Sequence, residues 1–200
     1  MNKAHLFFGS YIVAVLLQCY ACVLVDIRND QQAIVQMHNS IRRQEPAANM
    51  NALVWDNNIA NKAARWTETC NFEHQGRGYG ENLAYTTFNG SPPPSRNVVK
   101  SLFGLWAGEK PLWGRDTECG AACHYTQLIW ATTTRVGCAL SRCKRLRNGT
   151  DRNALYFACF YSPPGNYIGQ LPFIVGERCS QCGNGMACVG GLCTRKNREM

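Results

Sequence analysis

Cysteine is the first residue type in this sequence that could do chemistry, because twelve of its 200 residues are cysteines. Such a density is typical of proteins that fold in an oxidising compartment, where cysteines pair as disulfides. Without Cys19 and Cys22, which lie near the N-terminus, ten cysteines remain, an even number that can pair completely. The last four predict a small cross-linked tail, and they are Cys179, Cys182, Cys188 and Cys193.

Glu109 is also a candidate for a chemical role, because this charged residue continues the apolar stripe of a predicted helix. It lies four residues after Leu105 and seven after Leu102, in a helix that the pattern predicts over residues 97–109. A carboxylate on the core side of a helix needs partners, so we follow Glu109 as a candidate functional residue. His38 lies on the apolar stripe of another helix, where a single histidine is more often a core residue than a ligand.

Motifs of well-known enzymes are missing from the sequence. It contains neither the Gly-x-Ser-x-Gly motif nor the His-Glu-x-x-His motif. Gly76, Gly78 and Gly80 do not have dinucleotide-binding spacing, and no strand precedes them. The cysteines are interpreted as structural, so we expect a protein that is not an enzyme.

The elements that would position these residues are helices followed by strands. Apolar periodicity predicts helices over residues 30–44 and 57–69, besides the one over 97–109, and Asp56 or Asn57 could cap the second. Residues rich in β-branched and aromatic types predict strands over 132–140 and 155–161. This order indicates a layered α+β domain with the cross-linked tail attached.

The N-terminus is typical of a secretory signal peptide, which we place at residues 1–22. Lys3 precedes an apolar run over residues 6–17, and small residues follow at spacing that permits cleavage. An uncleaved anchor is the alternative, but the run is short for a membrane span. We therefore expect an extracellular, secreted protein. The whole chain has a net charge of +8, and removal of the segment takes away only one charged residue, Lys3.

Positive charge is concentrated between Arg135 and Arg152, where Asp151 is the one acidic residue. In a secreted protein such a cluster fits a glycosaminoglycan, anionic lipid or another acidic surface, and nucleic acid is not expected there. The alternative is a solvated loop without a partner. Asn148 lies in this segment and begins a glycosylation sequence, as does Asn89, and Pro92 makes Asn89 the poorer acceptor.

Four strings in this chain together resemble the signature motifs of the CAP superfamily, which includes cysteine-rich secretory and pathogenesis-related proteins. They are residues 38–42 (HNSIR), 80–84 (GENLA), 124–130 (HYTQLIW) and 156–167 (YFACFYSPPGNY). The resemblance covers residues 30–175, and the tail at 176–200 resembles the hinge of the animal members, especially the glioma-pathogenesis-related and peptidase-inhibitor-16-like branch. It implies a three-layer α-β-α sandwich.

The resemblance also implies a central cleft with two histidines and two acidic residues. Carried over by motif, these are His74, Glu81, Glu109 and His124. Imidazole suits Zn²⁺, and carboxylates ligate the metal or orient the rings. A zinc site is therefore a hypothesis, with no obligatory cofactor, and a hydrogen-bonded polar cluster without metal is the alternative.

Disulfide pairing is implied by the resemblance as well. It pairs Cys70 with Cys143, Cys138 with Cys159, and Cys119 with Cys123 across a short loop, while the four tail cysteines form two further bridges. The chain also departs from the family, which has glycine where this chain has Cys123. We expect the backbone beside His124 to be held differently for this reason.

Binding of a sterol or another lipid, or of a cell-surface receptor, is the function that the resemblance implies. The apolar mouth would lie in residues 105–118, with Leu112 and Trp113, and Trp106 is better explained as a core residue. One alternative is a metal-dependent or serine-type hydrolase that uses His74 and His124. The other is a protein-interaction module that acts through the basic segment and the tail. We expect a monomer in each case.

Overall fold

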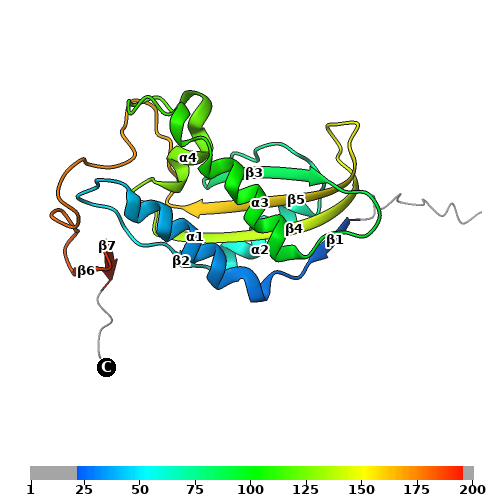
Figure 1. Ribbon diagram of the computed structural model, residues 1–200, viewed down its shortest axis with the longest axis horizontal. Coiled ribbons are helices and arrows are strands. Elements are labelled where there is room, and N and C mark those ends of the chain that lie inside the picture. Colours follow the sequence, from blue (N-terminus) through cyan, green and yellow to red (C-terminus); the bar gives the residue numbers. More distant parts are fainter. Residues whose placement is uncertain (1–21, 196–200) are drawn as a thin grey trace, which may run out of the picture.

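The computed structural model describes residues 22–195, which form one central sheet with helices on both faces and a small hairpin at the C-terminal end (Figure 1). The sheet has the antiparallel order β1 (Cys22–Val25), β4 (Arg135–Arg145), β5 (Arg152–Ser162), β3 (Gly80–Thr87), and β2 (Val54–Trp55) pairs in parallel with β4. The four α-helices are α1 (Gln31–Gln44), α2 (Asn57–Thr67), α3 (Ser95–Ala107) and α4 (Cys123–Leu128). Three short 3-10 helices are η1 (Arg28–Asp30), η2 (Lys110–Leu112) and η3 (Gly120–Ala122).

Alternation along β5 builds the two layers of core on either side of the sheet. Phe157 packs in the cluster that contains residues of α1, α3 and α4, whereas Tyr156 and Phe160 pack in the cluster that contains residues of α2. Successive side chains of a strand point to opposite faces, so one strand serves both cores. The molecule is therefore the three-layer α-β-α sandwich expected from the sequence, with α2 alone on its face (Figure 1).

The three predicted helices are present, but the third ends earlier than predicted, close to Glu109. The Asp56 carboxylate accepts hydrogen bonds from the backbone N–H groups of Asn58 and Ile59, which caps α2 as predicted. The expectation that the third helix reaches Glu109 is wrong, because α3 ends at Ala107 and Glu109 lies in the turn before η2. Pro111 has no N–H to donate to the Ala107 carbonyl, so the helical hydrogen bonds cannot continue past this point.

Five disulfides cross-link the described part of the chain. They join Cys70 to Cys143, Cys119 to Cys123, Cys138 to Cys159, Cys179 to Cys188, and Cys182 to Cys193. The first three are the pairs that the resemblance implies. Cys22 is the first residue of β1, where it lies opposite Cys143, and the rest of the predicted signal peptide falls outside the described residues.

The tail is packed onto the domain rather than suspended from it. Its hairpin consists of β6 (Met186–Val189) and β7 (Leu192–Arg195), and Leu192 is fully buried in the core that contains α1. The N–H of Cys193 donates to the Met50 carbonyl at 2.8 Å, and the Cys193 carbonyl accepts from the N–H of Ala52 at 2.9 Å. Among the described residues, no helix has the length and apolar character needed to cross a membrane.

Candidate functional site

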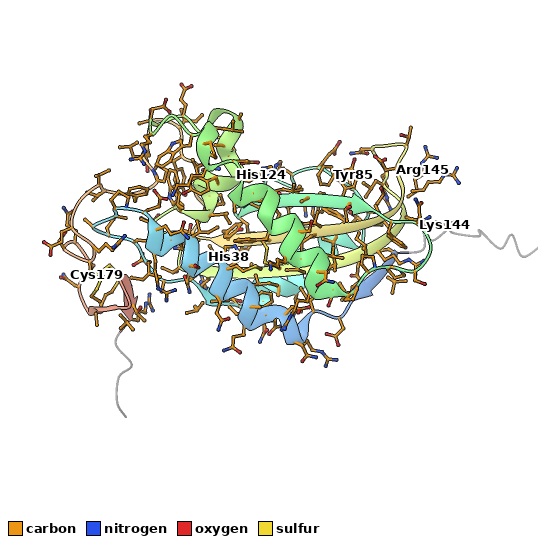
Figure 2. The ribbon with its side chains drawn as sticks, in the orientation of Figure 1. His38, Tyr85, His124, Lys144, Arg145 and Cys179 are labelled. Carbon is orange, nitrogen blue, oxygen red and sulfur yellow. A yellow bond between two sulfur atoms is a disulfide. The ribbon has the colours of Figure 1, made fainter. Side chains whose placement is uncertain are left out.

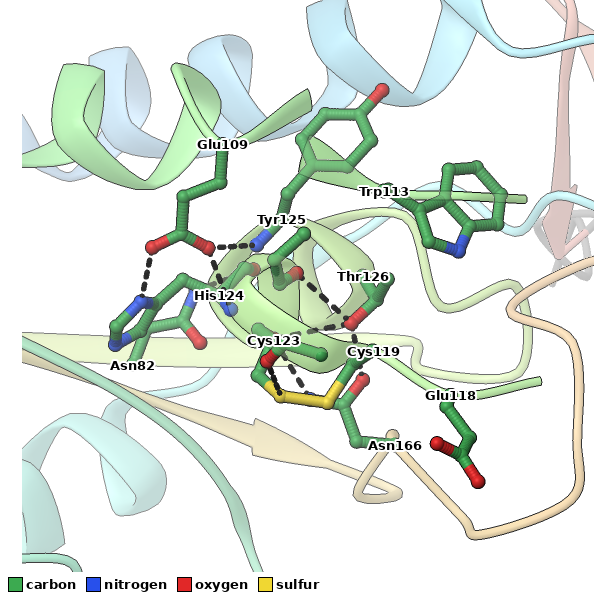
Figure 3. Close-up of a disulfide and its surroundings, with 12 residues drawn as sticks. Asn82, Glu109, Trp113, Glu118, Cys119, Cys123, His124, Tyr125, Thr126 and Asn166 are labelled. Atoms are coloured by element: carbon green, nitrogen blue, oxygen red, sulfur yellow. Dashed lines mark hydrogen bonds and ion pairs between the residues drawn. A yellow bond between two sulfur atoms is a disulfide. The ribbon is translucent and has the colours of Figure 1, made fainter. Parts of the chain in front are cut away.

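His124 and Glu109 form the first of two histidine–carboxylate pairs in the cleft (Figure 3). Glu109 Oε1 lies 2.6 Å from His124 Nδ1, and Glu109 Oε2 accepts from the backbone N–H groups of His124 and Tyr125 at 3.0 and 3.2 Å. One carboxylate thus fixes both the imidazole ring and the first turn of α4. The opposite ring nitrogen, Nε2, has no protein hydrogen bond among the described residues.

His74 and Glu81 form the second pair, on the loop before β3 and at its start. Glu81 Oε2 lies 3.2 Å from His74 Nδ1 and accepts from the N–H of Gln75, while Oε1 accepts from the N–H of Gly76. The carboxylate is nearly buried, with a side-chain exposure of 3%, whereas the His74 ring is 61% exposed. The loop therefore wraps around a fixed carboxylate and leaves its histidine at the surface.

Both pairs share an arrangement that suits a metal ligand. A carboxylate that binds Nδ1 of a histidine fixes the ring and leaves Nε2 for a metal. The structure does not unite the four residues, however: within residues 22–195, only cysteines form groups of three or more His, Cys, Asp or Glu ligand atoms within 4.8 Å of one another. No three of these four residues bring their ligand atoms within 4.8 Å of one another, and zinc binding stays a prediction.

The position before His124 has a cross-link where the related motif has a flexible glycine. Cys123 begins α4 and is bonded to Cys119 (Figure 3). Asn166 holds the same turn, because its side-chain amide donates to the Cys123 carbonyl at 2.8 Å and its amide oxygen accepts from the Thr126 hydroxyl at 2.8 Å. The backbone next to His124 is therefore fixed by a covalent bond and two hydrogen bonds.

Two cavities adjoin this turn, and a third lies on the other side of Trp130. One of about 200 Å³ is lined by His74, Glu81 and Asn166 among others. A second, of about 280 Å³, lies against Cys119, Asn166 and Trp130, and a third, of about 450 Å³, lies against Trp130 and residues 170–175. Trp130 separates the two larger hollows, whose lining is mostly apolar.

The comparisons with known proteins agree with this architecture. The model of the cysteine-rich secretory protein family, CAP, matches residues 35–161. Peptidase inhibitor 15 of Mus musculus is 36% identical over 83% of this chain and 70% of its own length, and GLIPR1-like protein 1 of Mus musculus is 36% identical over 84% and 73%. The chain belongs to the CAP family. It matches the animal branch named above.

Solved structures of CAP proteins have the same fold. A crystal structure of NaASP2 with Zn²⁺ is similar with a TM-score of 0.68 and 25% sequence identity, and it covers 83% of this chain and 95% of the other. Na-ASP-1 is similar with a TM-score of 0.70 and 25% identity over 88% of this chain and 49% of the other. The sandwich around the cleft is thus the common framework of these CAP proteins.

Two other residues singled out in the sequence are core residues in this CAP domain. Trp106 is buried and stacks against Phe157, and the His124 ring also stacks on Trp106 at a centroid distance of 6.1 Å. His38 is fully buried, and its two ring nitrogens lie 2.8 Å from the Ile34 carbonyl and 2.9 Å from the Tyr161 hydroxyl. Burial lowers the pKa of His38 to about 4, so this ring is neutral at physiological pH.

Sequence reasoning missed the segment of residues 167–175, which we call the apolar strap. Its exposed apolar side chains border the two larger cavities, and Ile168 is 97% exposed. The other exposed apolar residues of the strap are Tyr167, Leu171, Ile174 and Val175. The strap has no helical or strand periodicity, but its density of large apolar residues just after a turn was a usable signal.

The predicted mouth over residues 105–118 is only partly apolar in the structure. Leu112 is exposed, whereas the half-buried Trp113 ring packs against Tyr125 and Phe173. The end of this loop, residues 116–118, instead forms a wall of the 280 Å³ cavity. Asn89 and Asn148 are both exposed, and their glycosylation stays a prediction.

Proposed function

We propose that this CAP protein is secreted and not an enzyme, and that it binds a sterol or another small lipid beside Trp130. The observation that carries the proposal is the pair of mostly apolar hollows, of about 280 and 450 Å³, that share Trp130, Gln170 and Pro172. Small-molecule sites are concave and predominantly apolar, with a few polar groups that orient the ligand. Asn49 and Thr132 supply such polar groups at the larger hollow.

The apolar strap supports the same location. Large exposed apolar side chains that lie together mark sites for ligands or partners, because single ones are common but clusters are not. Ile168 borders the smaller hollow, and Leu171, Ile174 and Val175 border the larger one. A lipid that lies against the strap would cover surface that water now contacts.

The hydrogen bonds of His74 and His124 do not favour the serine-type form of the hydrolase alternative, and the metal-dependent form stays an alternative. A serine or cysteine hydrolase needs a hydroxyl or thiol within hydrogen-bond reach of the histidine base. Within residues 22–195, neither ring of His74 and His124 is hydrogen-bonded to a hydroxyl or a thiol, and the partner of each is a carboxylate. The Thr126 hydroxyl, close in sequence, donates to Asn166 instead.

The imidazole and carboxylate groups of the two pairs suit a weakly bound Zn²⁺ ion that takes no part in catalysis. His74 and His124 would bind it through Nε2, while Glu81 and Glu109 hold the rings. The similarity to NaASP2, which was crystallised with Zn²⁺, supports this proposal. Zinc titration calorimetry on the wild type and on His124→Ala tests it: we expect reduced heat in the variant, and equal heats would contradict the site.

Lipid uptake tests the main proposal. We compare saturable binding of labelled cholesterol by the purified wild type, Leu171→Ser and Leu105→Ser. Both leucines are exposed, but only Leu171 borders the hollow, so we expect loss of uptake in Leu171→Ser alone. Loss in Leu105→Ser alone would place the ligand at residues 105–118, and no saturable uptake by the wild type would reject lipid binding.

A further inference from the structure

The far end of the β4–β5 hairpin has a cluster of cationic side chains that the cleft does not use. Its members, which we call the basic tip, are Arg142, Lys144, Arg145 and Arg152. All four are exposed, and within residues 22–195 no carboxylate lies within 4.0 Å of any of them. Figure 2 shows Lys144 and Arg145 at one end of the molecule and Cys179 near the opposite end.

Strand geometry forces these charges together. The predicted strand over residues 132–140 is in fact longer, because β4 continues to Arg145. Arg145 lies directly opposite Arg152 in the register of the two strands, and Arg142 and Lys144 are two residues apart on the same strand. Like charges directly opposite each other destabilise a sheet, and a bound anion would relieve the repulsion.

The one acidic residue of the segment does not neutralise the basic tip. The Asp151 carboxylate accepts a hydrogen bond from the Tyr85 hydroxyl at 2.8 Å, and within residues 22–195 no ion pair joins it to a member of the basic tip. The four cations of the tip therefore outnumber the one carboxylate beside them, and the segment keeps a positive potential.

Two of the arginines are held in place for binding. The guanidinium of Arg142 lies over the Phe88 ring, 5.2 Å from its centroid, and Nε of Arg145 donates to the Gly149 carbonyl at 3.4 Å. A guanidinium that stacks on a ring keeps its edge free for two parallel hydrogen bonds to an oxyanion. Side chains that are already ordered lose less conformational entropy when a ligand binds.

We propose that the basic tip binds a sulfated glycosaminoglycan chain. The cations lie on both faces of the hairpin, since Arg142 and Lys144 point to one face and Arg145 and Arg152 to the other. A linear polyanion can follow both faces, whereas a flat membrane contacts one. The anionic leaflet of a cell membrane is also the cytoplasmic one, and this chain belongs to a family of secretory proteins.

Two triple variants with the same change in charge test the proposal. In Arg142→Gln/Arg145→Gln/Arg152→Gln the tip loses three cations. The control, Arg77→Gln/Arg115→Gln/Arg178→Gln, removes three exposed arginines from other loops. Affinity for immobilised heparin is measured against salt concentration for the secreted proteins, all of which keep Asn148. Thermal unfolding checks that each variant is folded.

We expect the tip variant to bind heparin at least about tenfold more weakly than the wild type, with a salt dependence reduced by about two to three ions. The control should bind nearly as tightly as the wild type. Equal weakening of the two variants would overturn the proposal, because net charge alone would then explain it. So would the absence of heparin binding by the wild type, or tip-dependent binding to phosphatidylserine vesicles without binding to heparin.

Discussion

His38 and His124 are histidines of one CAP domain that differ in what surrounds their rings. Both ring nitrogens of His38 have protein partners and the residue is fully buried, whereas His124 has a carboxylate on Nδ1 and a side-chain exposure of 33%. A histidine with both nitrogens satisfied in the core stabilises the fold. A histidine with one nitrogen fixed and the other open is suited to bind a ligand.

Arg42 is buried in the core with His38 and lies one turn further along α1. Its side chain is fully buried and donates four hydrogen bonds, at 2.8 to 3.2 Å, to backbone carbonyls. The four acceptors are the carbonyls of Asn51, Leu128, Ala131 and Thr133. Burial lowers the pKa of Arg42 to about 9, which still leaves it charged at neutral pH. It joins α1 to the segment that follows α4.

The largest effect is expected from Arg42→Met. The change removes one donor from four carbonyls, of which that of Ala131 still accepts from the Asn51 N–H at 3.2 Å, and each buried group left unpaired costs about 1–3 kcal/mol. We expect the free energy of unfolding in urea to fall by about 3–5 kcal/mol. The matched control is Arg43→Met, because Arg43 is exposed and donates to the Gly190 carbonyl at 2.9 Å.

The control should lose less than about 1 kcal/mol, since an exposed hydrogen bond contributes little. If both variants lost the same amount, the buried network would have no special role, and the contrast between the core and the cleft would fail.

Much of this contrast could be predicted from the sequence, because its signals are local. The apolar stripe of the first helix places His38 in the core, and the order of four motifs identifies the family and its sandwich. Helical phase singles out Glu109, although Leu105 of the predicted stripe is exposed and the helix ends at Ala107. The carboxylate still reaches His124, because the turn after α3 directs it to the N-terminal end of α4.

The rest depends on contacts between residues far apart in the chain. The extension of β4 to Arg145 follows from its pairing with β1 and β5, which no local pattern reveals. The burial of Leu192 likewise requires the docking of the tail on residues 50–52. The spacing between the two histidine–carboxylate pairs is also a tertiary property, so motif identity alone could name the four residues without fixing their distances.

A second prediction concerns the pH dependence of stability that the buried His38 causes. The pKa of His38 is about 4 in the folded protein and about 6.5 in the unfolded chain, so the unfolded chain binds more protons below pH 6.5. The stability that neutral His38 provides is complete above pH 6.5 and is lost as the pH falls through 4. The difference of about 2.5 pH units corresponds to about 3 kcal/mol.

Urea unfolding between pH 7 and 4 measures this loss. His38→Gln should be less stable at pH 7 and should remove most of the pH dependence, because glutamine does not titrate. The wild type, measured over the same pH range, is the reference for this comparison. If His38→Gln keeps that full dependence, other groups cause it, and the core histidine is not the pH-sensitive one.

The smallest effect is expected at the carboxylate that orients the cleft histidine. Glu109→Gln keeps an acceptor for the backbone N–H groups of His124 and Tyr125 but removes the charge beside Nδ1. We expect a loss of about 1 kcal/mol in the free energy of unfolding. Nitrogen NMR should show that the wild-type His124 ring has its proton on Nδ1 and that the variant has a mixture of tautomers. The His38 signals should not change, because its partners are untouched. An unchanged His124 tautomer would mean that Glu109 serves only to cap α4, and the arrangement that makes His124 a candidate ligand would then have another origin.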